Sequence, residues 1–155
     1  MGTKNRVIIG LAIVLVAAGI FAFKPEPKDP CINLYVDYGQ LNKNTKLTTC
    51  IDTSIKTNAL EVLKEANLKI EGTKKYGNGV ICRVNGLPDI TVESCEVMPP
   101  AEAYWAIIIK EKQVIPFPRK EWGWGQLAID QQYLNPGDSI GLVWTGPKGD
   151  LKWPD

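Results

Sequence analysis

The four cysteines are the residues of this chain whose chemistry is easiest to infer. They are Cys31, Cys50, Cys82 and Cys95. An even number of cysteines in a small domain is typical of disulfide bonds formed in an oxidising compartment. Four cysteines permit three pairings, and we predict the sequential one, Cys31–Cys50 and Cys82–Cys95, because it closes short loops. Each bridge would restrict the unfolded chain by roughly 3 kcal/mol in the loop-entropy description.

A metal site built from four thiolates is the alternative use of the cysteines. Such sites favour pairs of cysteines separated by only two to four residues, and this chain has no pair so close. It also lacks histidine, the commonest metal ligand and the commonest base near neutral pH. We therefore predict no metal site.

Catalytic patterns are weak throughout the sequence. Oxidised cysteines offer no thiolate nucleophile, and Ser54, Ser94 and Ser139 stand in no nucleophile-elbow pattern. Asp130 and Asp138 are the nearest candidates for the paired carboxylates of a glycoside hydrolase. Asp138, however, lies in a turn sequence that favours a structural role. We predict that the protein is not an enzyme.

Five tryptophans are the other residues that suggest chemistry. Trp122 and Trp124 alternate with glycines and predict an aromatic platform for a flat ligand, a sugar ring or another protein. The alternative is that one ring closes the core while the glycines permit an irregular backbone. Trp105 and Trp144 lie in predicted strands and are expected mainly in the core. Trp153 lies near the C-terminus, either in a loose tail or as a docking residue.

The N-terminus predicts export across a membrane. Lys4 and Arg6 precede an uncharged apolar run, Val7–Phe23. Positive charge is retained on the cytoplasmic side during insertion, which places the rest of the chain outside. The run is near the lower limit of about 17 residues for a spanning helix, and cleavage after Ala22 would leave the large Ile20 where a small residue is usual. A retained anchor is slightly favoured over a cleaved signal peptide, and a buried core helix is the alternative to both.

The charge balance argues against nucleic-acid partners. The chain has 18 basic and 17 acidic residues, and the apolar segment with its flank removes two of the bases, which leaves 16 against 17. A net charge of this size provides no electrostatic footprint for nucleic acid. The predicted partners are the membrane, through residues 7–23 if they are not cleaved, and a small molecule or a membrane or surface protein.

The chain divides into four predicted segments. Residues 1–23 form the signal peptide or anchor, and residues 24–30 a stiff, Pro-rich spacer. Residues 31–148 form one extracytoplasmic domain, which is long enough to bury its own core. Residues 149–155 form a tail.

Alternating apolar residues and turn signals predict several short strands in this domain. The polar stretch Gln40–Thr49 predicts a loop or an edge hairpin that is tied back at Cys50. Tyr76–Gly79 predicts a turn, Asn85-Gly86 a hairpin turn, and Asn135–Asp138 a tight turn. The predicted strands are Ile32–Tyr38, Val80–Val84, Tyr104–Ile109 and Ser139–Thr145.

A single helix is predicted from Asn58 to about Leu68. Asn58 is a good N-cap, and Glu61 three residues later completes a capping-box pattern. Leucines and alanines give this segment one narrow apolar face. One early helix followed by short strands predicts an α+β domain, in which the helix lies across one face of a sheet.

Four segments in this order resemble a known family. They are residues 58–66 (NALEVLKEA), 76–88 (YGNGVICRVNGLP), 103–107 (AYWAI) and 135–144 (NPGDSIGLVW). The set is similar to a family of bacterial exported domains of unknown function that is related to the C-terminal β-domain of the cobalamin carriers transcobalamin and intrinsic factor. The resemblance covers roughly residues 32–145. It implies a β-grasp-like fold, with one helix packed across a mixed sheet.

The same resemblance implies contact with a corrinoid through the loops around Asn85-Gly86 and Tyr104-Trp105. The cobalamin carriers hold their ligand between this domain and a large helical domain, which this chain lacks. The Cys82–Cys95 pair and the Trp122–Gly125 stretch fit a bacterial branch better than the carriers. The fold therefore transfers more readily than the ligand does.

Two functional hypotheses follow from the sequence. The first is an extracytoplasmic module, anchored or secreted, that binds a small cofactor-like ligand such as a corrinoid. The second is a structural or interaction protein that docks on a membrane or cell-surface complex through exposed aromatic loops. A concave pocket with convergent polar groups would favour the first hypothesis, and a flat apolar patch the second. The residues expected to contact ligand or partner are Asn85, Gly86, Tyr104, Trp105, Trp122 and Trp124.

Overall fold

The computed structural model describes residues 31–42, 45–112, 121–146 and 151–154. The predicted signal or anchor segment at 1–23 and the spacer at 24–30 lie outside these ranges, as does part of the predicted tail. Within the described ranges, no helix is both long enough and apolar enough to cross a membrane.

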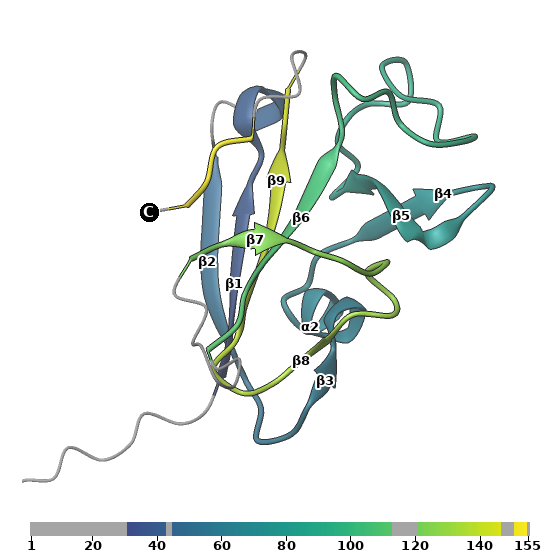
Figure 1. Cartoon of the computed structure of the whole chain (residues 1–155). Coiled ribbons are helices and arrows are strands. Elements are labelled where there is room, and N and C mark those ends of the chain that lie inside the picture. The colour runs from purple at the N-terminus through teal and green to yellow at the C-terminus, as the bar shows by residue number, and fades with distance from the viewer. Residues whose placement is uncertain (1–30, 43–44, 113–120, 147–150, 155) are drawn as a thin grey trace, which may run out of the picture.

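Five strands form the main sheet, in the order β2-β1-β9-β6-β7 (Figure 1). Strands β1 and β9 run parallel, and the other neighbouring pairs are antiparallel. The sheet is therefore mixed, as predicted. The strand bounds are β1 Cys31–Asp37, β2 Lys46–Asp52, β6 Trp105–Lys110, β7 Gly123–Trp124 and β9 Ser139–Trp144.

The central position belongs to β9, the last strand in the chain. Its segment, SIGLVW, is buried almost throughout, as expected for a strand covered on both faces. β1 instead alternates, with Ile32, Leu34 and Val36 fully buried toward the core and Asn33 exposed. Three of the four predicted strands, β1, β6 and β9, form within one residue of their predicted ends.

The edge strand β2 replaces much of the predicted loop Gln40–Thr49. A short 3₁₀ helix, η1 (Gly39–Asn42), leads into β2, which pairs with β1 along its whole length. The hairpin alternative is therefore the correct one. The pattern was hard to recognise because β2 is half exposed, so few of its residues need to be apolar.

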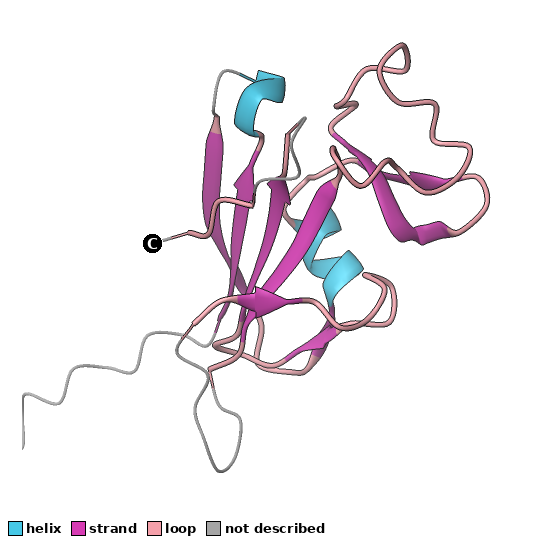
Figure 2. Cartoon of the chain, turned by 45° about the horizontal axis from the view of Figure 1, so that its top comes forward, coloured by secondary structure: helices cyan, strands magenta, loops and turns pink. Residues whose placement is uncertain are grey.

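One α-helix, α2 (Ala59–Glu65), packs across one face of the main sheet among the described residues (Figures 1 and 2). The Asn58 side chain accepts a hydrogen bond of 2.9 Å from the Leu60 N–H, which confirms the predicted N-cap. The structure shows no return bond from Glu61, so the predicted capping box is incomplete.

The helix ends about three residues earlier than predicted. Asn67 takes a left-handed conformation with φ of 59°. The Asn67 N–H then donates to the Lys64 carbonyl and the Leu68 N–H to the Leu63 carbonyl, at 2.9 and 3.0 Å. This pair of bonds is a Schellman cap, which stops the helix and turns Leu68 back into the core.

Two small sheets extend the domain beside the helix. β3 (Thr57–Asn58) pairs with β8 (Tyr133–Leu134), and β4 (Ile70–Thr73) pairs with β5 (Gly77–Val84). The turn predicted at Tyr76–Gly79 lies slightly earlier, at residues 74–76, and β5 begins at Gly77. Gly72 permits this tight hairpin, because a Cβ atom there would lie only 2.0 Å from the Gly77 carbonyl oxygen.

The predicted sequential disulfides are both present. Cys31–Cys50 joins β1 to β2 and Cys82–Cys95 joins β5 to the loop that follows it, each with a Cα–Cα distance of 5.7 Å. No free cysteine remains among the described residues. The two bridges indicate that the protein folds in a non-cytoplasmic, oxidising environment. The fold is an α+β domain with a mixed sheet and one packed helix.

Candidate functional site

A concave cleft of about 520 Å³ lies between β5, β6 and the loop before β6. Its volume is in the range of small-molecule sites, which is roughly 300–1,000 Å³. None of the described residues that line the cleft has a charged side chain. The lining residues are Gly79, Val80, Ile81, Met98, Pro99, Ala101, Tyr104, Trp105, Ala106, Ile107, Trp124 and Gly125.

The cleft is bordered by the edges of two strands rather than by their faces. Residues 104–107 of the β6 region and residues 79–81 of β5 line it consecutively. Side chains of a strand alternate between faces, so an unbroken run can reach one cavity only along the edge. β5 and β6 belong to different sheets and are not hydrogen-bonded to each other.

The backbone of β6 presents polar groups to this cleft. The Tyr104 carbonyl accepts from the Thr145 N–H at 3.1 Å and therefore points toward β9. The Ile107 carbonyl accepts from the Gly125 N–H at 2.9 Å and therefore points away from β9. Backbone groups alternate in direction along a strand, so the N–H and C=O of Trp105 and the N–H of Ile107 also point away from β9. The structure shows no hydrogen bond to these three groups from any described residue.

The pairing with β7 explains why this edge remains open. β7 has only two residues and pairs with Ile108 and Ile109. A Cβ atom at Gly125 would lie 3.0 Å from the Ile107 side chain. Glycine therefore allows the backbone to pass close to Ile107 as the chain leaves the sheet. Beyond Gly125, the edge of β6 faces the cleft instead of another strand.

An arginine fixes the loop that forms the outer wall. The Arg83 side chain is 11% exposed and forms an ion pair of 3.2 Å with Glu71. It also donates to the Pro88 carbonyl at 3.0 Å and to the Glu93 carbonyl. Together with the Cys82–Cys95 bridge, these bonds hold the loop against β5. The hydrogen bond that Arg83 donates to the Glu71 carboxylate is the main cause that lowers the pKa of Glu71.

Asn85 and Gly86 form the predicted hairpin turn. Their φ angles are 53° and 78°, the left-handed values that a type I′ turn requires. The Asn85 side chain donates to the Tyr38 hydroxyl at 2.7 Å and accepts from the Lys69 N–H at 2.9 Å. Neither residue lines the cleft. Their contacts fasten the end of β5 to the core, which is a structural role.

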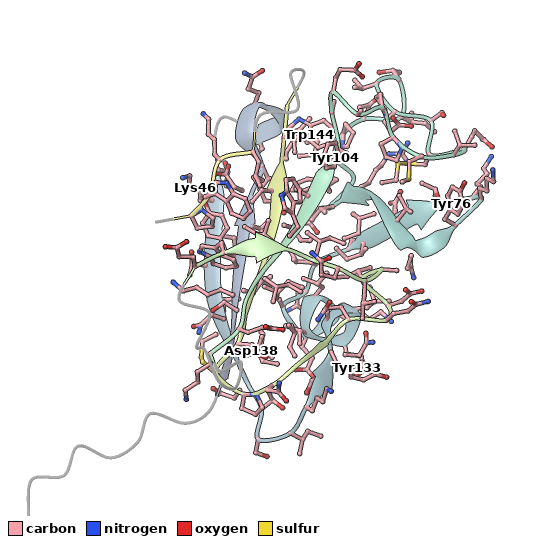
Figure 3. The ribbon with its side chains drawn as sticks, in the orientation of Figure 1. Lys46, Tyr76, Tyr104, Tyr133, Asp138 and Trp144 are labelled. Carbon is pink, nitrogen blue, oxygen red and sulfur yellow. A yellow bond between two sulfur atoms is a disulfide. The ribbon has the colours of Figure 1, made fainter. Side chains whose placement is uncertain are left out.

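Tyr104 and Trp105 both border the cleft but in different ways. The Trp105 ring is only 4% exposed and packs edge-on against Tyr38 and Trp144, at centroid distances of 5.4 and 5.7 Å. Its indole N–H donates to the Leu87 carbonyl at 3.1 Å. The predicted core position of Trp105 and Trp144 is confirmed, so Trp105 offers its backbone and not its ring face. Figure 3 shows Tyr104 and Trp144 close together at the same end of β6 and β9.

Trp122 and Trp124 make different contacts. Trp124 is 44% exposed, lines the cleft and packs edge-on against Trp153 at a centroid distance of 5.8 Å. Trp122 is half-buried and lies 6.3 Å from the Tyr35 ring on β1. The register of β7 places Trp124 beside Ile108 on the sheet face opposite the helix. Trp122 is not among the residues that line the cleft, so the two rings do not form one shared platform over it.

The two candidate carboxylates, Asp130 and Asp138, stand in different environments. Asp138 is buried and accepts from the Lys112 and Asn135 N–H groups at 2.8 and 2.7 Å. This pattern holds the turn between residues 135 and 138, as its sequence indicates. Asp130 is exposed. No cluster of three or more histidine, cysteine or acidic side chains suited to a metal occurs among the described residues.

The sequence did not reveal the walls of the cleft. Val80 and Ile81 lie in the predicted strand Val80–Val84, whereas Gly79 is predicted in the turn before it and is in fact part of β5. Met98 is 63% exposed, and only its position before two prolines marked its loop as irregular. A strand edge has no sequence signature of its own, because both faces of the strand can be apolar.

The chain matches no described protein family and no curated protein. A solved structure with some similarity is that of a candidate metal binding protein from Ruminococcus gnavus ATCC 29149, determined at 1.30 Å. It shares 22% sequence identity with this chain and aligns with a TM-score of 0.44 over 74% of this chain and 95% of that chain. Similarity at this level assigns neither a function nor a ligand.

Proposed function

We propose that this protein is an exported binding module that holds an uncharged ligand in the cleft between β5 and β6. The observation that carries the proposal is the shape and chemistry of this cleft. It is concave, the side chains of its described lining residues are uncharged, and backbone donors and an acceptor converge on it from one wall. Apolar walls with a few fixed polar groups are the usual composition of ligand sites.

The resemblance to the cobalamin carriers suggests the first ligand to test. A β-grasp-like domain of this family would present the loops around β5 and β6 to a corrinoid, and the cleft lies beside Tyr104 in one of those two regions. A corrinoid has a flat apolar ring with amide groups at its periphery. Such a molecule suits a cleft that combines apolar side chains with backbone polar groups.

The location also belongs to this proposal. Two disulfides place the domain in an oxidising compartment. The apolar run at residues 7–23 would deliver it there, either as a retained anchor with the N-terminus inside or as a cleaved signal. We further propose that the module has no catalytic activity of its own.

Equilibrium dialysis of the oxidised protein against cobalamin and its precursor cobinamide tests the ligand. We expect retention with a dissociation constant of roughly 1 μM or tighter, about −8 kcal/mol. Met98→Arg places a charge in the uncharged cleft and should weaken binding at least about tenfold. Ile90→Arg is the matched control, because Ile90 lies on the same loop, is 69% exposed and does not line the cleft. An equal loss of affinity in both variants, or no retention of corrinoid by the parent protein, would rule out a corrinoid as the ligand of this cleft.

One observation favours a second candidate function, which is docking on another protein. The segment between β5 and β6 exposes several apolar side chains, and exposed apolar surface can mark an interaction site. They are Ile90, Val92, Val97 and Met98. In this case Ile90→Arg should weaken the association at least as much as Met98→Arg. The same pair of variants therefore distinguishes the two functions.

A further inference from the structure

The open edge of β6 has the hydrogen-bonding pattern of an unfinished sheet. From Trp105 to Ile107 it offers a donor, an acceptor and a second donor to the cleft, and no described residue uses them. Backbone groups of this kind are normally paired in folded proteins, by other backbone groups or by water. This row therefore specifies a complementary ligand: an acceptor, a donor and a second acceptor at the spacing of an extended chain.

The opposite wall supports the same conclusion. Residues 79–81 of β5 also border the cleft along their edge, and β5 is hydrogen-bonded to β4 but not to β6. Figure 1 shows the green β6 and the teal β5 near each other. They belong to different sheets, and residues of both line the cleft. A single extended segment between them would lie next to both edges.

We infer that this cleft binds an extended, uncharged peptide segment, which pairs with the β6 edge at Trp105 and Ile107 as an added strand. This inference depends on the cleft being a ligand site, as proposed above, but it names a different ligand from the corrinoid. Peptide recognition by strand addition takes its affinity from main-chain hydrogen bonds and its specificity from pockets for alternate side chains.

The neighbouring side chains define the chemistry of the peptide. Residues of the added strand would point alternately to the face of Ile107 and to the face of Trp124, because cross-strand neighbours share a face. Both of these neighbours are apolar, and the lining residues that the structure describes carry no charge. Apolar, uncharged residues at successive positions therefore fit, whereas a charged residue would be buried without a partner.

The cleft also limits the length of the pairing. The Gly125 N–H already donates to the Ile107 carbonyl, so the hydrogen bonds between β6 and an added strand would end at Ile107. At the other end the Ala103 N–H bonds to the Pro100 carbonyl in a turn, which closes the edge before Tyr104. The open edge spans two residue steps, about 7 Å. A short stretch at the edge is protected from indiscriminate strand pairing.

Amide hydrogen exchange of the full-length oxidised protein, followed by NMR, gives the first test. Without ligand, the Trp105 and Ile107 amides should exchange at least about a hundredfold faster than the Ala106 and Ile108 amides, which point toward β9. Equal protection of all four amides in the free protein would show that the edge is closed and would overturn the inference.

A defined peptide gives the second test. The probe is acetyl-Ala-Val-Ala-Val-Ala-amide at about 5 mM, a concentration at which even millimolar affinity gives substantial occupancy. It should slow exchange of the Trp105 and Ile107 amides at least about threefold. An analogue with the same side chains and every internal amide N-methylated cannot donate to the Trp105 carbonyl, and it should slow neither amide. Equal protection by both peptides, or protection by neither, would overturn strand addition.

A protein variant isolates one bond of the predicted ladder. Ile107→Pro removes a donor that no described residue uses, and proline is tolerated at strand edges. It should fold and lose the peptide effect on Trp105. If the variant does not fold, the comparison of the peptide with its N-methylated analogue still tests strand addition. If the protein retains a corrinoid but the peptide protects neither amide, strand addition is overturned and the proposed function stands. If the peptide protects both amides but no corrinoid is retained, strand addition is supported and a corrinoid is ruled out as the ligand.

Discussion

Arg83 provides the sharpest test of how the fold supports the cleft, through the variant Arg83→Met. The arginine is nearly buried and its donors reach the Pro88 and Glu93 carbonyls and the Glu71 carboxylate. Methionine keeps much of the side-chain volume but makes none of these bonds. The change leaves two loop carbonyls and one carboxylate without their partner.

The magnitude follows from these contacts. Hydrogen bonds that involve a charged group contribute about 1.5–3 kcal/mol each when they are buried. The Glu71 carboxylate is 33% exposed, so water replaces part of what it loses and its share is reduced. The two loop carbonyls alone therefore account for about 3–6 kcal/mol, and we expect the free energy of unfolding to fall by about that amount. In a domain of this size, such a loss lowers the melting temperature by roughly 12–25 °C.

Urea unfolding of the oxidised protein measures this change, with Lys69→Met as the matched control. Lys69 pairs with the same carboxylate at 3.3 Å, but its side chain is 76% exposed. Loss of an exposed pair should cost about 0–1 kcal/mol. If Arg83→Met destabilises the protein no more than Lys69→Met does, the loop is not held by Arg83 and the reasoning is refuted.

Three further predictions follow from the described contacts. In the folded protein the pKa of Glu71 lies below its usual value of 4.5, chiefly because of its hydrogen bond to Arg83. The ionised Glu71 therefore stabilises the fold above pH 4.5, and this stabilisation is lost as the pH falls through the lower pKa of the folded state. Glu71→Gln should therefore reduce the decline in unfolding free energy between pH 7 and pH 3, and an unchanged decline would contradict this. Trp124→Ala should leave the melting temperature nearly unchanged. Trp122→Ala should lower it by several degrees, because the Trp122 ring packs on the sheet. A large drop in melting temperature for Trp124→Ala would show that the Trp124 ring belongs to the core. Gly141→Ala should destabilise the domain by about 1–3 kcal/mol, because its Cβ would lie 2.6 Å from a side-chain carbon of Ile108, and thermal unfolding that matches the parent protein would show that Ile108 can move aside.

The sequence predicted the local features because each depends on neighbouring residues. The Asn58 cap, the Asn85-Gly86 turn and the Asp138 turn all act through backbone groups within a few residues. The disulfide pairs were predictable for a related reason, since the sequential pairing closes the shortest loops. Alternation of apolar residues likewise identified β1, β6 and β9.

Long-range pairing determined everything that makes the cleft. The last strand, β9, inserts between β1 and β6, and no local pattern specifies that order. Arg83 could have faced solvent or formed an ion pair, and only the packing of the loop decided that it would bind backbone carbonyls as well. Trp122 and Trp124 are two residues apart, yet Trp124 lines the cleft and Trp122 packs toward β1.

The sequence by itself determined the composition of this domain: one capped helix, several short strands, and two bridges that favour an oxidising compartment. Only the tertiary structure decided that β7 would cover just two residues of β6 and that β5 would end beside β6 in a different sheet. The physical reason is that a hydrogen-bonding edge belongs to the backbone, which every residue shares. Side-chain patterns show which face of a strand is buried, but not whether its edge has found a partner.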